Sequence, residues 1–346
     1  MSKYIARCIA AVFAIALAAL PAMADAPART APVAAIGKNP AAKPGHVPPV
    51  PLLWKVSDED NHLYLLGSFH LLKPEDYPLA PEVEAAFADA ETLVFEIAPQ
   101  EMASPALATK MLQAALRTGG TLNDDLPPKT QKKLQEWVDA NQTQLMAMGM
   151  HSVILQRMEP WYVSLLVTIA GMHNYGLQAE HGLDAHFSQT ALAANKPSTG
   201  LETGDQQIEF LDGMGVSAQA QLLDEALTQF NQNGKEVEKL HSAWRNGDVD
   251  TLWNEMALEM KRQYPELYAR MNATRNDAWL PKLQQRLSAP GTDDTMVIVG
   301  ALHLLGSDGL VEKLRAKGYR VERICSACKP AAAGKQAKPA SKSAEH

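Results

Sequence analysis

Three short apolar runs constrain the fold of this chain more than any other feature. The clearest is Thr-Met-Val-Ile-Val-Gly-Ala-Leu at residues 295–302, and similar runs occupy residues 63–69 and 92–97. Near-continuous apolar runs of this length are typical of strands buried on both faces of a parallel or mixed sheet. Residues 198–202 predict one more strand. The sequence therefore predicts an α/β fold built on a mixed central sheet.

The first two predicted strands form a hairpin. Residues 53–57 and 63–69 flank Asp58-Glu59-Asp60-Asn61, which is polar and turn-forming. Residues 81–90 then predict a short helix, because a proline occupies the first turn.

Most of residues 99–290 has a helical pattern, which predicts a large helical insertion between strands of the sheet. The apolar run at 161–172 is 12 residues long and falls short of the ~20 needed to span a bilayer. It therefore predicts a buried helix. A helix over 307–317, with Ser307 or Asp308 as its N-cap, and a strand over 319–324 close a β-α-β unit, so helices flank the sheet.

The first 24 residues have the composition of a secretory signal peptide. Lys3 and Arg7 precede an apolar run over residues 9–20, and Ala22-Met23-Ala24 supplies small residues before a cut expected after Ala24. The alternative, a membrane anchor, requires a longer apolar run. We therefore expect a periplasmic or secreted protein with no transmembrane segment in the mature chain.

Three further segments follow. Residues 25–50 are rich in Pro and Ala and predict a disordered tether, residues 51–325 form the α/β domain, and residues 326–346 predict a disordered basic tail. The chain carries a net charge of −7, and the three non-domain segments carry +2, +2 and +3, which leaves −14 for the domain. So acidic a domain argues against nucleic acid or anionic lipid as a partner.

Two cysteines remain after the signal, in Cys325-Ser-Ala-Cys328. In an oxidising compartment this pair predicts a small disulfide near the chain end. A catalytic dithiol and half of a metal site are the alternatives, but no helix-forming sequence follows to lower the pKa of the first thiol.

One motif occurs twice. Leu65-Leu66-Gly67-Ser68-Phe69-His70 and Ile298-Val299-Gly300-Ala301-Leu302-His303 each end an apolar strand in Gly-x-x-His. Ligands of open α/β sheets bind at the carboxyl ends of the strands, where Glu96 of the 92–97 strand also lies. Two imidazoles and a carboxylate are a plausible open metal site, although a single strand-end histidine is more often only a satisfied polar residue.

Two other residues are candidates for the same site. Glu202 ends the 198–202 strand. It is either a general base or a partner that holds a metal ligand from outside, or it only helps to cap the next helix, for which Thr203 and Asp205 are the other cap candidates. Arg275 is either a surface ion-pair residue or, if it faces the site, an oxyanion or substrate-carboxylate partner. We assign His181-Gly182-Leu183-Asp184 a structural role.

Common catalytic and cofactor motifs are missing from the sequence. It has no His-Glu-x-x-His, no Gly-x-Ser-x-Gly, and no Walker or Rossmann glycine loop. The usual zinc-protease, serine-hydrolase and nucleotide-binding classes therefore have no support.

Taken together, the motifs resemble the TraB/PrgY/GumN family, which is related to the Tiki metalloproteases, and in particular its GumN-like bacterial branch. The resemblance extends in order from about residue 52 to 324. Its matching segments are residues 64–74, Phe95-Glu96, Gly182-Leu183-Asp184, residues 200–203 with Gln206-Gln207, residues 244–248, residues 275–279 and residues 300–306. Ser68 stands where Thr is usual, a conservative departure.

The resemblance implies a mixed sheet with both Gly-x-x-His motifs and a glutamate at its carboxyl edge. It implies His70, Glu96 and His303 as the metal-site residues, holding manganese or cobalt, with zinc or iron also compatible. In the Tiki branch these motifs support metal-dependent cleavage of peptide bonds. The GumN-like branch takes its name from an association with exopolysaccharide genes, and its activity is poorly established.

Three functions follow from these residues. The leading hypothesis is a metal-dependent hydrolase of the cell envelope that acts on peptide bonds, with Glu96, Glu202 and Arg275 as its catalytic groups and a peptide or small molecule as its substrate. The alternative is a non-catalytic periplasmic binding protein linked to exopolysaccharide production or peptide signalling. The third is hydrolysis of a non-peptide ester or amide.

Overall fold

The computed structural model describes residues 45–230 and 235–328, which build a six-stranded sheet in the order β4-β3-β5-β2-β1-β6. The strands are β1 (Leu53–Ser57), β2 (His62–Ser68), β3 (Thr92–Ile97), β4 (Ser198–Glu202), β5 (Thr295–Gly300) and β6 (Arg320–Arg323). Strands β4, β3, β5 and β2 run parallel, whereas β1 is antiparallel to both β2 and β6. The predicted mixed α/β sheet and its first hairpin are confirmed.

Helices flank this sheet, and most belong to two insertions on either side of β4. The helices are α2 (Pro81–Asp89), α3 (Pro99–Met102), α4 (Pro105–Ala115), α5 (Pro128–Ala140), α6 (Gln142–Ala147), α7 (Ser152–Leu155), α8 (Pro160–Asn174), α9 (Leu183–Ala193), α10 (Gly204–Asp212), α11 (Val216–Phe230), α12 (Lys235–Arg245), α13 (Val249–Leu252), α14 (Glu259–Gln263), α15 (Pro265–Tyr268), α16 (Thr274–Leu287) and α17 (Leu310–Ala316). Short turns include the 3₁₀ segments η2 (Pro74–Asp76), η4 (Ala179–His181) and η7 (Ala301–His303). Proline opens six of these helices, where its fixed φ suits the first turn and its missing N–H costs no hydrogen bond.

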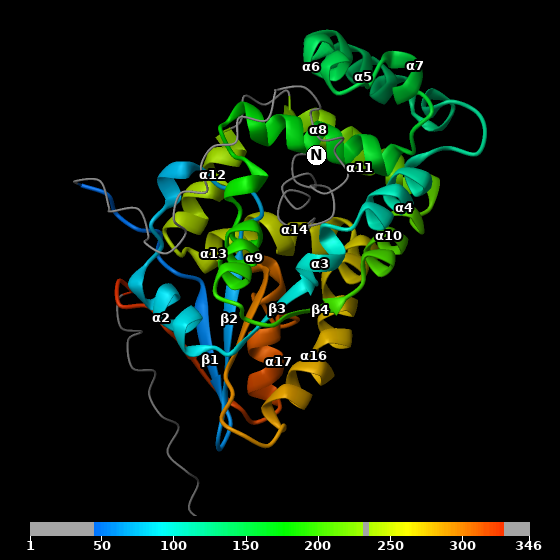
Figure 1. Ribbon diagram of the computed structural model, residues 1–346. Helices are drawn as coiled ribbons and strands as arrows, with labels where there is room; N and C mark the ends of the chain where they lie inside the picture. Colours follow the sequence, from blue (N-terminus) through cyan, green and yellow to red (C-terminus); the bar gives the residue numbers. More distant parts are fainter. Residues whose placement is uncertain (1–44, 231–234, 329–346) are drawn as a thin grey trace, which may run out of the picture.

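The sheet holds the larger of two apolar cores. Every residue of the central strand β5 is buried, as expected of a parallel strand covered on both faces. The edge strand β6 instead carries charged residues along its exposed positions, which discourages pairing with another chain. A second core lies between α8 and α11, which run side by side above the carboxyl ends of β3 and β4 in Figure 1.

Helix α8 contains the apolar run at 161–172; ten of its residues are buried, and seven of these belong to the second core. The predicted buried helix is confirmed. Across the described ranges 45–230 and 235–328, no helix combines the length and the apolar character that a membrane crossing requires.

Two predicted boundaries in the last β-α-β unit are wrong. Strand β5 ends at Gly300 rather than at residue 302, because the chain turns into η7 and leaves the sheet. Helix α17 begins at Leu310 rather than at residue 307. Asp308 does not cap it, since its carboxylate pairs with Lys261 and accepts a hydrogen bond from the Tyr268 hydroxyl.

The predicted signal peptide at 1–24, residues 25–44 of the predicted tether and residues 329–346 of the predicted tail lie outside the described residues. The predicted tether boundary at residue 50 is too late. The Val50 N–H donates to the Arg245 carbonyl at 2.7 Å, and the Val47 carbonyl accepts from the Arg245 side chain, so this segment is part of the domain. The predicted disulfide is confirmed between Cys325 and Cys328.

A buried ion-pair cluster fixes the loop that follows β2. Asp76, which is fully buried, accepts hydrogen bonds from the Lys73 N–H and from His241 Nε2, both at 2.8 Å, and pairs with Arg245. Burial alone would raise the pKa of Asp76, but these partners outweigh it and lower the pKa below its usual value. The cluster therefore ties α12 to the segment that carries His70.

We expect Asp76→Asn to lower the free energy of unfolding at pH 7 by about 3 kcal/mol, because it leaves buried donors without a charged acceptor. The lowered pKa also predicts that this stabilisation is present above the unfolded-state value of about 4 and is lost as the pH falls below it. Urea denaturation between pH 7 and pH 3 measures both effects.

The control is Asp205→Asn, which removes an exposed ion pair with Lys110 and should cost less than about 1 kcal/mol. Equal stabilities of the two variants at pH 7 would contradict the role given to Asp76.

Candidate functional site

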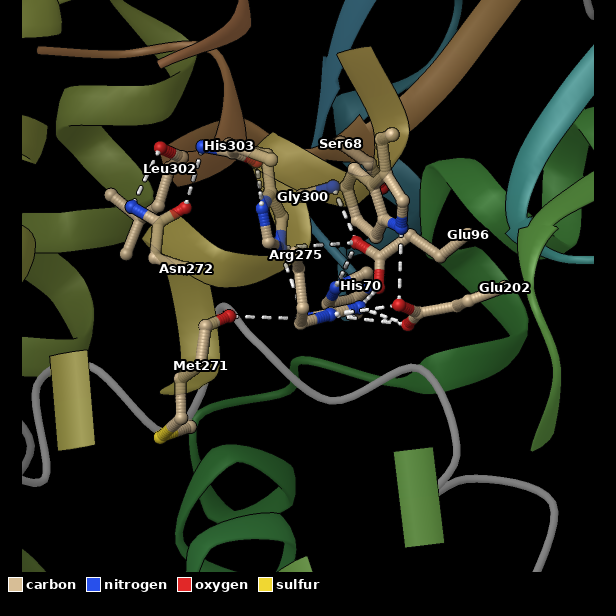
Figure 2. A network of polar contacts seen from close by, with 12 residues as sticks. Ser68, His70, Glu96, Glu202, Met271, Asn272, Arg275, Gly300, Leu302 and His303 are labelled. Atoms are coloured by element: carbon tan, nitrogen blue, oxygen red, sulfur yellow. Dashed lines mark hydrogen bonds and ion pairs between the residues drawn. The ribbon is translucent and has the colours of Figure 1, made fainter. Parts of the chain in front are cut away.

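The five residues singled out from the sequence meet at the carboxyl edge of the parallel strands (Figure 2). His70 follows the end of β2, Glu96 lies near the end of β3, and Glu202 is the last residue of β4. His303 follows β5 in η7, and Arg275 comes from the first turn of α16. All five are at most 7% exposed, so their contacts are made in a low-dielectric interior.

The guanidinium of Arg275 lies at the centre of this group. It contacts Glu96 Oε2 at 2.6 Å through Nη2, and Nη2 and Nε both donate to the carboxylate of Glu202. Nη1 donates to the Met271 carbonyl at 3.2 Å and to His303 Nε2 at 3.0 Å. All five N–H groups of the side chain are therefore engaged, and of the two alternatives for Arg275 the structure excludes the surface ion pair.

Glu202 serves this cluster rather than the next helix. Its carboxylate also accepts from Trp279 Nε1 at 3.1 Å and from the Gln207 side chain. The cap of α10 is made by Thr203, whose hydroxyl accepts from the Gln206 N–H at 3.3 Å. Burial would lower the pKa of Arg275, but Glu96 and Glu202 raise it, so the side chain stays cationic.

His303 is held in one tautomer. Its Nδ1 lies 2.7 Å from Asn276 Oδ1, while the Asn276 amide nitrogen donates to Asn272 and to the Asp308 carbonyl. Nδ1 therefore carries the hydrogen, and the Nε2 lone pair faces Arg275. Burial, together with the charges of Arg275 and His70, lowers the pKa of His303 well below its usual value, so the ring is neutral.

His70 has the same arrangement with a charged partner. Its Nδ1 lies 2.7 Å from Asp184 Oδ2, which also accepts from the Ser68 hydroxyl. Burial alone would lower the pKa of His70, but Asp184 outweighs it and raises the pKa to about 9. A threonine in place of Ser68 would present the same hydroxyl, which explains why this departure from the family pattern is conservative.

The remaining nitrogens of both histidines face one oxygen. His70 Nε2 and His303 Nε2 lie 4.0 and 3.9 Å from Glu96 Oε1, which also accepts from the Gly300 N–H at 2.8 Å. His70 Nε2 is buried and has no hydrogen-bond partner within the described part of the chain. Two imidazole nitrogens and a carboxylate are residue types that could hold a divalent metal ion, but His303 Nε2 now accepts from Arg275 Nη1 at 3.0 Å, and that contact would have to open first.

The residue types of this site suit a divalent metal ion, but the distances between the two Nε2 atoms and Glu96 Oε1 are too long for shared coordination. Four-coordinate ligands about 2.1 Å from an ion lie about 3.4 Å from one another, so each imidazole would have to close on Glu96 by about half an ångström. Accordingly, no three His, Cys, Asp or Glu side chains of residues 45–230 and 235–328 form a group that could hold an ion as they stand.

Two close approaches explain the glycines of the motifs. A Cβ on Gly67 would lie 3.2 Å from Ala301 Cα, so this glycine lets the two Gly-x-x-His segments pack together. A Cβ on Gly182 would lie 2.0 Å from the His70 carbonyl oxygen. This glycine therefore lets the start of α9 approach His70 closely enough for Asp184 to reach its ring.

A cavity of about 350 Å³ adjoins the site. His70, Glu96 and Asp184 lie in its wall, and the remaining wall comes from β3, α3, η4 and α9. The buried polar cluster is thus accessible from one side.

Several residues of the site were not identified as such from the sequence. Asp184, to which we gave a structural role, orients His70, and Asn276 does the same for His303. Gln207 and Trp279 both donate to Glu202. All four lie in segments that carry the family resemblance, and their place in those segments was the available signal.

Comparisons with known proteins agree with that resemblance. A family model described as the TraB/PrgY/gumN family matches residues 52–323. The chain is 27% identical over 261 residues to "Uncharacterized protein YbaP" of Escherichia coli (strain K12), which covers 74% of this chain and 89% of that protein. A protein of the same name from Shigella flexneri is similar to the same extent. No solved structure is significantly similar to the chain.

We expect Arg275→Met to lower the free energy of unfolding by about 3–5 kcal/mol, because it leaves Glu96 and Glu202 buried without their cation. Adding Glu202→Gln should recover part of that loss, since it removes one of the two uncompensated charges. Urea denaturation of the single and double variants measures the coupling.

Arg315→Met is the control, because its ion pair with Glu312 is exposed and should contribute less than about 1 kcal/mol. An Arg275→Met protein as stable as this control would show that the buried cluster does not hold the site together.

Proposed function

The chain belongs to the TraB/PrgY/GumN family, and from that premise we propose that it is a metal-dependent hydrolase of the cell envelope that cleaves peptide bonds. The choice of peptide bonds rests on the similarity of its motifs to those of the Tiki metalloproteases. The envelope location rests on the signal-like composition of residues 1–24.

One observation carries the proposal. Two buried imidazoles direct their Nε2 atoms at the same oxygen of Glu96, and the Nδ1 atom of each is held by an oxygen acceptor. Histidines that bind metals are typically fixed in this way through their second nitrogen. A buried ring nitrogen without a partner, as in His70, is costly unless the site uses it.

In this proposal His70, Glu96 and His303 hold a divalent ion, for which the family resemblance favours manganese or cobalt, while imidazole and carboxylate ligands also suit zinc or iron. Such an ion, when bound, polarises a carbonyl group and lowers the pKa of water. Asp184 and Asn276 orient the two rings. Glu96, whose Oε1 faces both rings, is the third ligand or, alternatively, the general base.

Glu202 and Arg275 act in this proposal through other residues. Glu202 makes its hydrogen bonds with Arg275, Trp279 and Gln207, so we assign it to positioning of the guanidinium rather than to proton transfer. Arg275 fixes Glu96 Oε2 and faces the His303 lone pair. Its predicted role as an oxyanion partner stays a prediction, and it requires that one of these contacts open when substrate binds.

A second candidate function is binding without turnover. It is favoured by the complete pairing of the Arg275 guanidinium with Glu96, Glu202 and His303, which satisfies these groups without an ion. Such a protein would use the adjoining cavity to hold a peptide or small molecule. Hydrolysis of a non-peptide ester or amide is a third candidate that uses the same groups.

We expect His70→Ala and His303→Ala to abolish binding of manganese and cobalt while the proteins stay folded. Asp184→Asn should weaken metal binding by about 10- to 100-fold, because it removes the charged partner that orients the His70 ring. Metal content after purification without chelator, together with titration of the chelated protein, measures both effects.

His173→Ala is the matched control, since this histidine of α8 is exposed and lies outside the site, and its metal content should equal that of the wild type. Wild-type affinity in the His70→Ala variant would rule out the proposed metal site.

We expect the metal-loaded protein to hydrolyse blocked peptides, and we expect a chelator or the His303→Ala substitution to stop the reaction. Mass spectrometry of a peptide mixture after incubation detects the new termini. Peptides bound but recovered intact would favour the second candidate, and cleavage of esters alone would favour the third.

A further inference from the structure

The cavity beside His70 has a composition that selects what can enter it. Three residues of the site, His70, Glu96 and Asp184, form part of its lining, which we call the end wall. Most of the remaining wall is apolar, and its largest members are Phe95, Ile97 and Met102. Pockets that fix a ligand with a few polar groups and enclose the rest in apolar surface are typical of small-ligand sites.

Three elements, α3, η4 and α9, form the sides of this cavity. On one side α3, which follows β3 directly, contributes Met102 and the adjoining Ala103. On the other side η4 and α9 contribute Ala179, Ala185 and Ser188. The side chains that face the space are small or flexible, and this leaves room for a side chain of the ligand next to the polar end wall.

The acidic group of the cavity wall that has no ion-pair partner among the described residues is Glu180. Glu96, Asp184 and Glu180 line the cavity, and it has no lysine or arginine in its wall. Glu96 is paired with Arg275 and Asp184 with His70, whereas the exposed Glu180 has no ion-pair partner among the described residues. An anionic ligand would therefore be repelled, and a basic group near Glu180 would be attracted.

We propose that this cavity is the substrate side-chain pocket of the site, and that it takes a large apolar residue of a peptide whose neighbouring residue is neutral or basic. The apolar side chain lies between α3 and α9, which places the adjoining peptide bond at the end wall formed by His70 and Glu96. This inference rests on the proposed function for the cleavage of the bound peptide, but the preference in peptide binding can be measured without cleavage.

The test is equilibrium binding to the full-length protein in the presence of a chelator, so that no hydrolysis takes place. The probes are blocked hexapeptides that differ only at two central positions, Leu-Ala, Glu-Ala and Leu-Lys. We expect the Leu-Ala peptide to bind at least about tenfold more tightly than the Glu-Ala peptide, because only leucine gains from apolar burial. The Leu-Lys peptide should bind about threefold more tightly still, and Glu180→Gln or high salt should remove that increment.

Two variants of matched chemistry locate the pocket. Ala103→Trp fills the space beside α3 and should weaken binding of the Leu-Ala peptide by at least about tenfold. Ala106→Trp places the same indole on an exposed position three residues away, outside the cavity wall, and should leave binding unchanged.

The outcomes separate the two proposals. Equal binding of the Leu-Ala and Glu-Ala peptides, or unchanged binding in Ala103→Trp, would overturn the pocket. Selective binding that Ala103→Trp removes, in a protein that hydrolyses none of these peptides when loaded with metal, would support the pocket and contradict the hydrolase.

Discussion

The buried guanidinium of Arg275 is the constraint on which the rest of the site depends. A cation in an apolar interior is unfavourable unless charged partners satisfy it, and here Glu96 of β3 and Glu202 of β4 do so together. The three groups come from two neighbouring parallel strands and from α16. Their pairing therefore fixes the helix over the sheet edge and aligns the strand ends with each other. The same guanidinium faces His303, so the position of that ring depends on the ion-pair cluster as well.

The two histidines show how one local motif is used twice with different electrostatics. Each follows a parallel strand, and each ring is fixed through Nδ1, but His70 faces a carboxylate and His303 faces an amide. Asp184 therefore raises the pKa of His70, whereas burial beside Arg275 lowers that of His303. The pKa values of the two imidazoles are therefore shifted in opposite directions around a single carboxylate. A symmetrical repeat of the motif in the sequence thus produces an asymmetric site.

Much of this arrangement could be predicted from the sequence where the signal is local. The apolar runs, the polar turn after Ser57 and the spacing of the two cysteines each depend on adjacent residues, and the structure confirms all three. The role of Asp184 could not be predicted in this way, because its partner lies 114 residues earlier in the chain. The start of α17 at Leu310 could not be predicted for the same reason, because the side chain of Asp308 contacts residues of α14 and α15 instead of capping the helix. In both cases a long-range contact decided between roles that the local sequence left open.

The charges of the site also bear on how it folds. In structural zinc sites the ligands usually have no compensating partner in the chain, so folding depends on the ion. Here the carboxylates of Glu96 and Glu202 have a cation within the protein itself, and Asp184 is paired with His70. Each of these carboxylates therefore has a cationic partner within the chain, and none depends on an added ion for charge compensation. For the proposed metal site this predicts that removal of the ion leaves the fold intact, so that metal content would report on the site rather than on folding.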